Sequence, residues 1–265
     1  MLRNLQLAAL AWLVALPVGT PSWAAQTVPH EAYYRVTVEK LKVPGDILSA
    51  SGEMAMRVSR DCQKWTVQHE TNFRVVFSGG RRFDIESTYR IHEALDGARL
   101  DFKAITKVNG AIVVNTKGSA RILADGTSGE VEFRLPEKRL VKLPPNTGFP
   151  LSLANRSIDL LRAGNNINRY VLFDGVGIYH VTDVAAGEAI LLSTRPEGDV
   201  DLLASRSWRI ESTLFPYGVI DSEPAGTVVT QTQENGIASG FLADYGELIA
   251  RGELKSIRRL PDPDC

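Results

Sequence analysis

The sequence predicts a mainly β protein in which a large, twisted antiparallel sheet forms an open barrel or β-spiral around one short helix. Apolar and polar residues alternate along most of the chain, which is the period of a half-buried strand. Turn pairs that contain glycine, such as Asn109-Gly110, Asp125-Gly126 and Asn235-Gly236, separate the alternating stretches. Strands and helices do not alternate regularly, as they would in a parallel, nucleotide-binding sheet.

The clearest alternation covers two neighbouring stretches that the turn Gly79-Gly80 separates. Every second residue from Trp65 to Phe77 is directed to one side, and so is every second residue from Phe83 to Ile91. Such a face either fills a core or lines a cavity for an apolar ligand, and the alternation leaves both interpretations open. The candidate core-facing or ligand-facing residues are Trp65, His69, Phe73, Phe83 and Tyr89.

The middle of the chain interrupts this pattern. The stretch from Lys142 to Pro150 holds three prolines, which excludes a central strand. Residues 153–162 have the spacing of an amphipathic helix, which Ser152 can cap and Gly164 can end. Strands are predicted again at residues 169–173, 188–193, 206–214, 227–234, 237–245 and 248–257. The prediction is at least ten strands and one helix.

Residues 1–24 are predicted to be a cleaved signal peptide. Arg3 supplies a positive charge, an apolar run extends from Leu5 to Val18, and Ser22 and Ala24 are the small residues that precede a cleavage site. The run is shorter than the roughly 20 residues of a membrane-spanning helix, and an uncleaved anchor is the alternative. With no second hydrophobic stretch, residues 25–265 are expected to be soluble, and we expect them to form one domain.

The two cysteines, Cys62 and Cys265, predict one disulfide that ties the C-terminus to an early strand. The expected export to an oxidising compartment favours the disulfide over a pair of buried thiols. In the chain-entropy model, closing a loop of this length contributes roughly 5 kcal/mol of stability.

Composition and motifs exclude several classes of function. The formal net charge of −1 does not fit a protein that binds nucleic acid. No G-x-S-x-G nucleophile motif occurs, and the four histidines do not have the spacing of metal ligands. We therefore predict a protein that is not an enzyme and that has no metal or other cofactor. A hydrolase that uses His69 or His30 is the enzymatic alternative.

Several segments together resemble one family over nearly the whole of the predicted mature chain. They are HEAYYRVTVEK, CQKW, the helix ending in RAG that is followed by RYVLFDG, and the closing ENGIASGFLADYGELIARGEL and LPDPDC. The chain resembles the EipB family of periplasmic cell-envelope integrity proteins. This resemblance implies a single β-spiral domain, a disulfide at the positions of Cys62 and Cys265, and resistance to envelope stress without enzymatic activity.

The resemblance also implies a partner, a periplasmic tetratricopeptide-repeat protein. An analogy with lipoprotein carriers adds a lipid as a candidate ligand. Two functions are therefore expected from the sequence. The first is maintenance of the cell envelope through protein–protein contacts, and the alternative is a periplasmic carrier or sensor that binds a lipid or other amphiphile inside the curved sheet.

Overall fold

The computed structural model describes residues 27–42, 47–123, 128–244, 246 and 248–265. The predicted signal peptide and the predicted Asp125-Gly126 turn lie outside these residues. The helices are α1 (Pro150–Arg162) and the short 3-10 helix η1 (Val200–Leu203). The strands are β1 (His30–Leu41), β2 (Ile47–Arg60), β3 (Lys64–Phe77), β4 (Arg82–Ala94), β5 (Arg99–Val108), β6 (Ala111–Ile122), β7 (Gly129–Leu135), β8 (Arg139–Leu143), β9 (Thr147–Gly148), β10 (Ile167–Phe173), β11 (Ile178–Ala185), β12 (Glu197–Gly198), β13 (Ser207–Pro216), β14 (Gly226–Gln233), β15 (Ala238–Asp244) and β16 (Leu248–Arg259).

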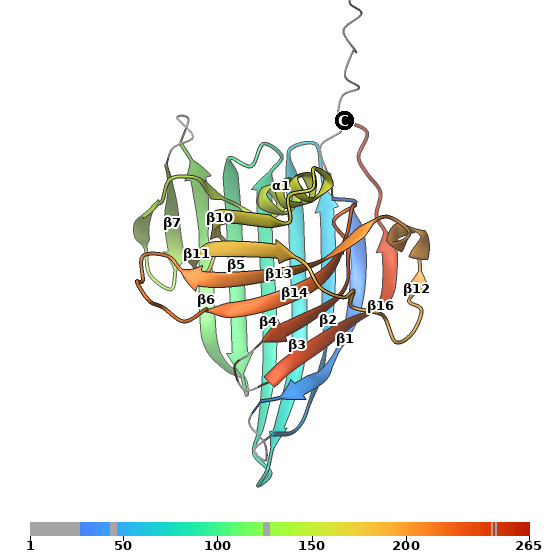
Figure 1. The fold of residues 1–265 in the computed structure, drawn as a ribbon. Helices are drawn as coiled ribbons and strands as arrows, with labels where there is room; N and C mark the ends of the chain where they lie inside the picture. Colours follow the sequence, from blue (N-terminus) through green and yellow to red (C-terminus); the bar gives the residue numbers. More distant parts are fainter. Residues whose placement is uncertain (1–26, 43–46, 124–127, 245, 247) are drawn as a thin grey trace, which may run out of the picture.

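The sixteen strands of the described chain form one sheet, which confirms the predicted fold class. Their order is β8-β7-β6-β5-β4-β3-β2-β1-β16-β15-β14-β13-β11-β10-β9, with β12 attached to β16. In Figure 1 the strands from β2 to β6 stand upright, and β10, β11, β13 and β14 cross in front of them. A sheet of so many twisted strands curls on itself. Because β8 and β9 are the two ends of this order, the barrel is open along one side.

Glycines that face the interior leave room for aromatic rings on the neighbouring strand. Phe73, Phe102 and Phe241 are each paired across the ladder with a glycine: Gly52, Gly118 and Gly252, respectively. A Cβ atom on Gly252 would lie 2.1 Å from the Phe241 ring. Because each ring occupies the space above a bare backbone, bulky side chains fit inside a strongly curved sheet.

Helix α1 closes one end of the barrel, and Glu93 on β4 fixes its first turn. The buried carboxylate accepts hydrogen bonds from the backbone N–H groups of Leu151, at 2.8 Å, and Ser152, at 2.7 Å. These N–H groups have no partner inside the helix, and the positive end of the helix dipole favours the negative charge. Burial raises the pKa of Glu93, and its hydrogen bonds with Leu151 and Ser152 oppose that rise.

The predicted helix is confirmed, but its predicted cap is wrong. The helix begins at Pro150, and the N-cap residue is Phe149, whose side chain makes no capping hydrogen bond. Proline is favoured in the first turn because it has no N–H to satisfy there. Ser152 is already inside the helix, where its hydroxyl donates to the Phe149 carbonyl. The capping function belongs to Glu93, which is distant in sequence.

The turn between β10 and β11 crosses the barrel interior and joins its two sides. The Tyr89 hydroxyl on β4 donates to the Asp174 carbonyl oxygen at 2.6 Å, and the Thr116 hydroxyl on β6 donates to the Gly175 carbonyl at 3.3 Å. A Cβ atom on Gly175 would lie 2.7 Å from Phe102 on β5. The Asp174 carboxylate accepts from the N–H groups of Val176 and Gly177 and so holds the turn in shape.

One predicted strand is wrong. Residues 188–193 form no strand and instead lie against β14 and β15. The Ile190 N–H donates to the side-chain oxygen of Gln231 at 3.0 Å, and the Ser193 hydroxyl donates to Glu253 at 2.5 Å. Because side chains satisfy these polar groups, the segment does not need a strand partner.

We expect Glu93→Ala to lower the free energy of unfolding by about 2 kcal/mol, because two buried N–H groups lose their acceptor. Urea denaturation followed by circular dichroism measures the change. Glu132→Ala is the matched control, because Glu132 is exposed on β7 and no hydrogen bond or ion pair of its side chain occurs within the described chain. Equal stability of the two variants would contradict this role of Glu93.

Candidate functional site

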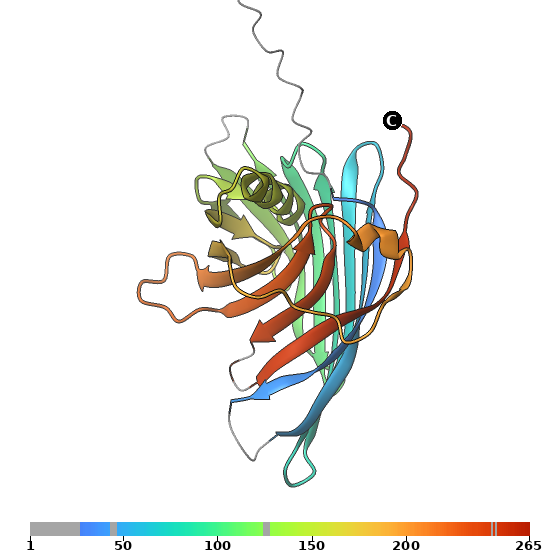
Figure 2. The same cartoon turned by 45° about the vertical axis from the view of Figure 1, so that its right-hand side comes forward.

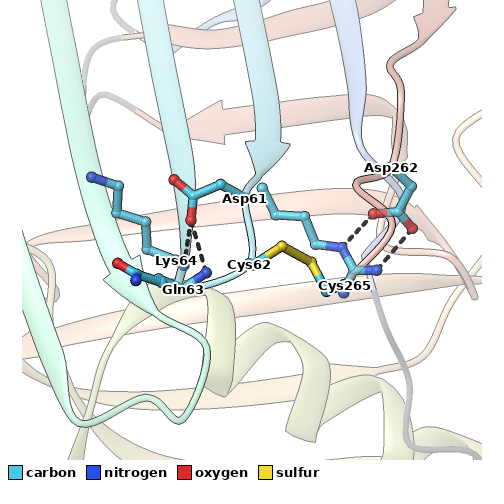
Figure 3. The surroundings of a disulfide bond; sticks show 7 residues. Asp61, Cys62, Gln63, Lys64, Asp262 and Cys265 are labelled. Carbon is cyan, nitrogen blue, oxygen red and sulfur yellow. Dashed lines mark hydrogen bonds and ion pairs between the residues drawn. A yellow bond between two sulfur atoms is a disulfide. The ribbon is translucent and has the colours of Figure 1, made fainter.

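The disulfide and the inward face of β3 and β4 are the two candidates for a functional site. Figure 3 shows Cys62 and Cys265 joined where the turn after β2 meets the C-terminal tail. Their Cα atoms are 5.6 Å apart across 203 residues of sequence. The Asp61 carboxylate accepts from the N–H groups of Gln63 and Lys64, both at 2.9 Å, and shapes the turn.

An ion pair holds the tail beside the disulfide. The Arg60 guanidinium bonds both carboxylate oxygens of Asp262, one of them at 2.9 Å. Arg60 also lies over the ring of Trp65, 5.6 Å from its centroid. Both cysteines are exposed to solvent. Because bidentate contacts fix geometry, the tail is positioned independently of the sulfur–sulfur bond.

The five candidate residues on the inward face of β3 and β4 do not form one site. His69 and Tyr89 are register partners, and their rings lie 5.7 Å apart in a tilted arrangement. Trp65 is buried in the cluster that packs near α1. Phe73 packs on Gly52 near the middle of the barrel wall. Phe83 lies at the β3–β4 hairpin, where it is 37% exposed and meets Phe77 edge to face.

The middle of this inward face is less covered by protein than the end near α1. Trp65, Val67 and Val75 are buried, whereas His69, Thr71 and Phe73 between them are only half-buried. On β4, Ser87 and Tyr89 are likewise half-buried. Within the described residues, the side chains of His69 and Thr71 have no hydrogen-bond partner. This region therefore presents polar groups that another molecule could bond.

His69 is surrounded by protein although its ring is not fully covered. Burial lowers its pKa to about 4, so the imidazole is neutral at pH 7. Its neighbours across the ladder are Met56 on β2 and Tyr89 on β4. Neither is an acid or a nucleophile suited to a hydrolase. The Tyr89 hydroxyl already donates a hydrogen bond to the Asp174 carbonyl oxygen.

In the part of the chain that the structure describes, His30 and His92 also lack the partners of a catalytic triad. The buried His30 places Nδ1 2.7 Å from the Val28 carbonyl oxygen, and its Nε2 has no partner in the described chain. His92 lies beside a hydroxyl, with Nδ1 2.9 Å from Thr66 Oγ1. No carboxylate bonds either ring nitrogen of His92 in the part of the chain described, so nothing orients that pair for proton transfer.

Sequence reasoning missed a buried polar cluster beneath α1. Asp183 on β11 accepts hydrogen bonds from Ser157 at 3.1 Å, Tyr170 at 3.0 Å and Ser212 at 2.7 Å. Asn168 in turn donates to the Ser157 hydroxyl at 2.8 Å. Asp183 occupies an inward position of a strand with alternating residues, and a charged residue at such a position is the feature of the sequence that could have indicated the cluster. Because every hydroxyl proton points at the carboxylate, the cluster serves to attach the helix to the sheet.

A hollow of about 690 Å³, open to solvent, lies on the outside of the barrel between β1–β3, β12 and β16. Its wall carries paired charges, because Glu31 bonds both Arg57 and Arg258. Among the residues described, no group of three or more acidic, histidine or cysteine side chains is arranged to hold a metal ion.

Comparison with known proteins assigns the family. The model of the EipB-like family matches residues 21–261. The chain belongs to the EipB-like family. The chain is also similar to a crystal structure of a β-barrel-like protein from Brucella abortus, which is described as a domain of unknown function, DUF1849. The two share 22% identity with a TM-score of 0.77, covering 90% of this chain and all of that one. No curated protein matches the chain.

The predicted EipB resemblance is thus confirmed, and so is its barrel-like fold. No helix in the described part of this EipB-like chain is long and apolar enough to cross a membrane. A disulfide that is exposed on both sides fits a protein of an oxidising compartment, because cytosolic reductants would have access to it.

Replacing both cysteines, in Cys62→Ser/Cys265→Ser, should lower stability by up to about 5 kcal/mol, the chain-entropy value for a loop of this length. Thermal unfolding with and without reductant measures the effect. The reduced native protein should match the double variant, and the variant itself should not respond to reductant. Unchanged melting after complete reduction would contradict a structural role.

Stability should fall in acid in a way that depends on His69. A histidine whose pKa is lowered on folding favours the native state above its ordinary pKa of about 6.5, and that contribution is lost as pH falls toward about 4. His69→Phe should therefore flatten the decline of the unfolding free energy between these values. Burial also lowers the pKa of His30, so part of the pH dependence remains in His69→Phe. Thr71→Val, which changes the same inward face without removing a titratable group, is the control and should leave the slope unchanged.

Proposed function

We propose that the chain is a non-enzymatic periplasmic protein that helps to maintain the cell envelope through protein–protein contacts. The observation that carries this proposal is membership of the EipB-like family over residues 21–261. The EipB resemblance implies such a role under envelope stress. The exposed disulfide between Cys62 and Cys265 supports export, since it would be reduced in most cytosolic environments.

The architecture is suited to a scaffold for binding. Strands of up to fourteen residues, a helix anchored by Glu93 and a terminal disulfide together fix the positions of the connecting loops. Rigid strands that present loops are a common basis of recognition surfaces. In this proposal the disulfide contributes rigidity and takes no part in redox chemistry, and a periplasmic tetratricopeptide-repeat protein is the partner that the resemblance implies.

One observation favours the second candidate, a carrier or sensor for an amphiphile. The half-buried inward face around His69, Thr71 and Ser87 combines apolar surroundings with polar groups, as ligand sites do. The two functions are compatible, because a ligand inside the barrel leaves the outer loops free for a partner.

The main proposal is tested by complementation of a deletion strain. Loss of the gene should sensitise cells to detergent and to inhibitors of cell-wall synthesis, and the full-length chain should restore resistance. A version without residues 1–24 should fail to restore it, because it stays in the cytoplasm. The same version behind an unrelated signal peptide is the control and should succeed. Full rescue by the cytoplasmic version would overturn the proposal.

The carrier candidate is tested by filling the barrel. Native mass spectrometry of protein purified from envelopes should detect a bound lipid, and Ser87→Phe should displace it by occupying the space above β4. Thr88→Phe, the neighbouring outward position, is the matched control and should retain the lipid. A homogeneous ligand-free mass for the native chain would exclude the candidate.

A further inference from the structure

The connection between β13 and β14 forms a projection from the barrel wall. Figures 1 and 2 both show this orange loop extending away from the strands that it joins. Both ends of residues 217–225 are fixed: the Tyr217 N–H donates to the Ile178 carbonyl, and the Ala225 N–H donates to the Leu214 carbonyl. We refer to residues 217–225 as the projecting loop.

Contacts within this chain restrain the conformation of the projecting loop. Tyr217 stacks on His180 of β11, with ring centroids 4.6 Å apart. Pro216 directly precedes the loop and Pro224 lies near its end, and both restrict the backbone. Asp221 has a φ of +55°, a left-handed conformation that only a few residue types adopt readily. A preformed loop loses little conformational entropy on binding, which favours recognition.

The tip of the projecting loop exposes large apolar side chains. Ile220 is 89% exposed and Val219 is 58% exposed, and Tyr217 at the base is 39% exposed. Val176, in the neighbouring β10–β11 turn, is 42% exposed. Single exposed apolar residues are ordinary, but a cluster on a fixed projection is typical of a contact surface. Its convex form requires a concave, apolar site on the other molecule.

The charges of the loop select the kind of partner. Asp221 and Glu223 follow the apolar tip along the chain, and residues 217–225 contain no lysine or arginine. Neither carboxylate forms an ion pair within the described chain. An anionic membrane surface would repel this loop, whereas a protein pocket with a basic rim would attract it.

We propose that the projecting loop is a protein-docking element, in which Val219 and Ile220 enter an apolar pocket of a partner protein and Asp221 and Glu223 meet lysine or arginine side chains at its rim. This inference rests on the proposed function and assigns its protein contacts to a surface. Ile220 is the central anchor, because it is the most exposed of the large apolar residues that the structure describes.

The first step of the test is photo-crosslinking in cells. A benzoylphenylalanine residue replaces Ile220 in one variant of the full chain and Leu191 in a second. Leu191 is the matched control, because it is also an apolar loop residue and is 77% exposed. The proposal predicts a discrete protein adduct from position 220 that position 191 does not give.

The second step measures binding of the crosslinked protein after its purification. Ile220→Ser should weaken the affinity at least roughly tenfold, as the loss of an interface anchor does. Asp221→Asn removes the charge but keeps a residue that tolerates the left-handed conformation, and it should weaken binding and reduce its salt dependence. Leu191→Ser should bind as the native chain does. All three positions are exposed, and unchanged circular dichroism verifies that the variants fold.

Four results would overturn the proposal. Two come from crosslinking: no adduct from position 220, or an adduct that is a second copy of this chain. Two come from binding: equal affinity of Ile220→Ser and the native protein, or binding of the native chain to phosphatidylglycerol vesicles that Ile220→Ser abolishes.

Complementation separates this inference from the proposed function. If the native chain restores stress resistance and Ile220→Ser does so equally, the docking assignment fails while the envelope function stands. If deletion causes no sensitivity, the envelope function fails whatever the crosslinking result.

Discussion

The pairing of β1 with both β2 and β16 is the constraint on which the rest of the architecture depends. One edge of β1 begins the series of hairpins that runs to β8, and the other edge joins the last strand of the chain. Residues more than 200 positions apart, such as Glu31 and Arg258, thereby become neighbours. The register of β1 with β16 shifts at Tyr33/Tyr34 and again at Val38/Lys40. Such bulges increase the local twist, which helps the sheet to curl.

Two interior contacts convert the curled sheet into a supported barrel. Glu93 attaches the start of α1 to β4, and the Asp174–Gly177 turn reaches from the second half of the sheet to β4, β5 and β6. In both cases a carboxylate accepts hydrogen bonds from backbone N–H groups of a turn. At Glu93 the site is buried, where unpaired groups would be costly. The exposed disulfide joins the turn after β2 to the C-terminal tail on the outside of the barrel. The chain can therefore present its loops in fixed positions, which is the physical requirement of the proposed contact function.

The sequence was informative where structure is local and less informative where it depends on distant residues. The Gly79-Gly80, Asn109-Gly110 and Asn235-Gly236 turns were predictable, because each contains a glycine with a positive φ angle, a conformation that favours glycine. The alternation from Trp65 to Val75 likewise predicted the inward face of β3. The helix cap was not predictable, since Glu93 lies nearly sixty residues before the N–H groups that it bonds. For residues 188–193, an apolar stretch resembled a strand but is held by the side chain of Gln231.

The two halves of the sheet should behave as one rigid body joined through β1–β16 and the Asp174–Gly177 turn. Hydrogen–deuterium exchange of the oxidised protein, followed by mass spectrometry, is the measurement that separates one body from two. Peptides from β1, β16 and the turn should exchange as slowly as the central strands β3 and β4, through the same global opening. Rapid exchange across β10, β11 and β13 while β3 and β4 remain protected would contradict a single rigid body, because the halves would then open independently.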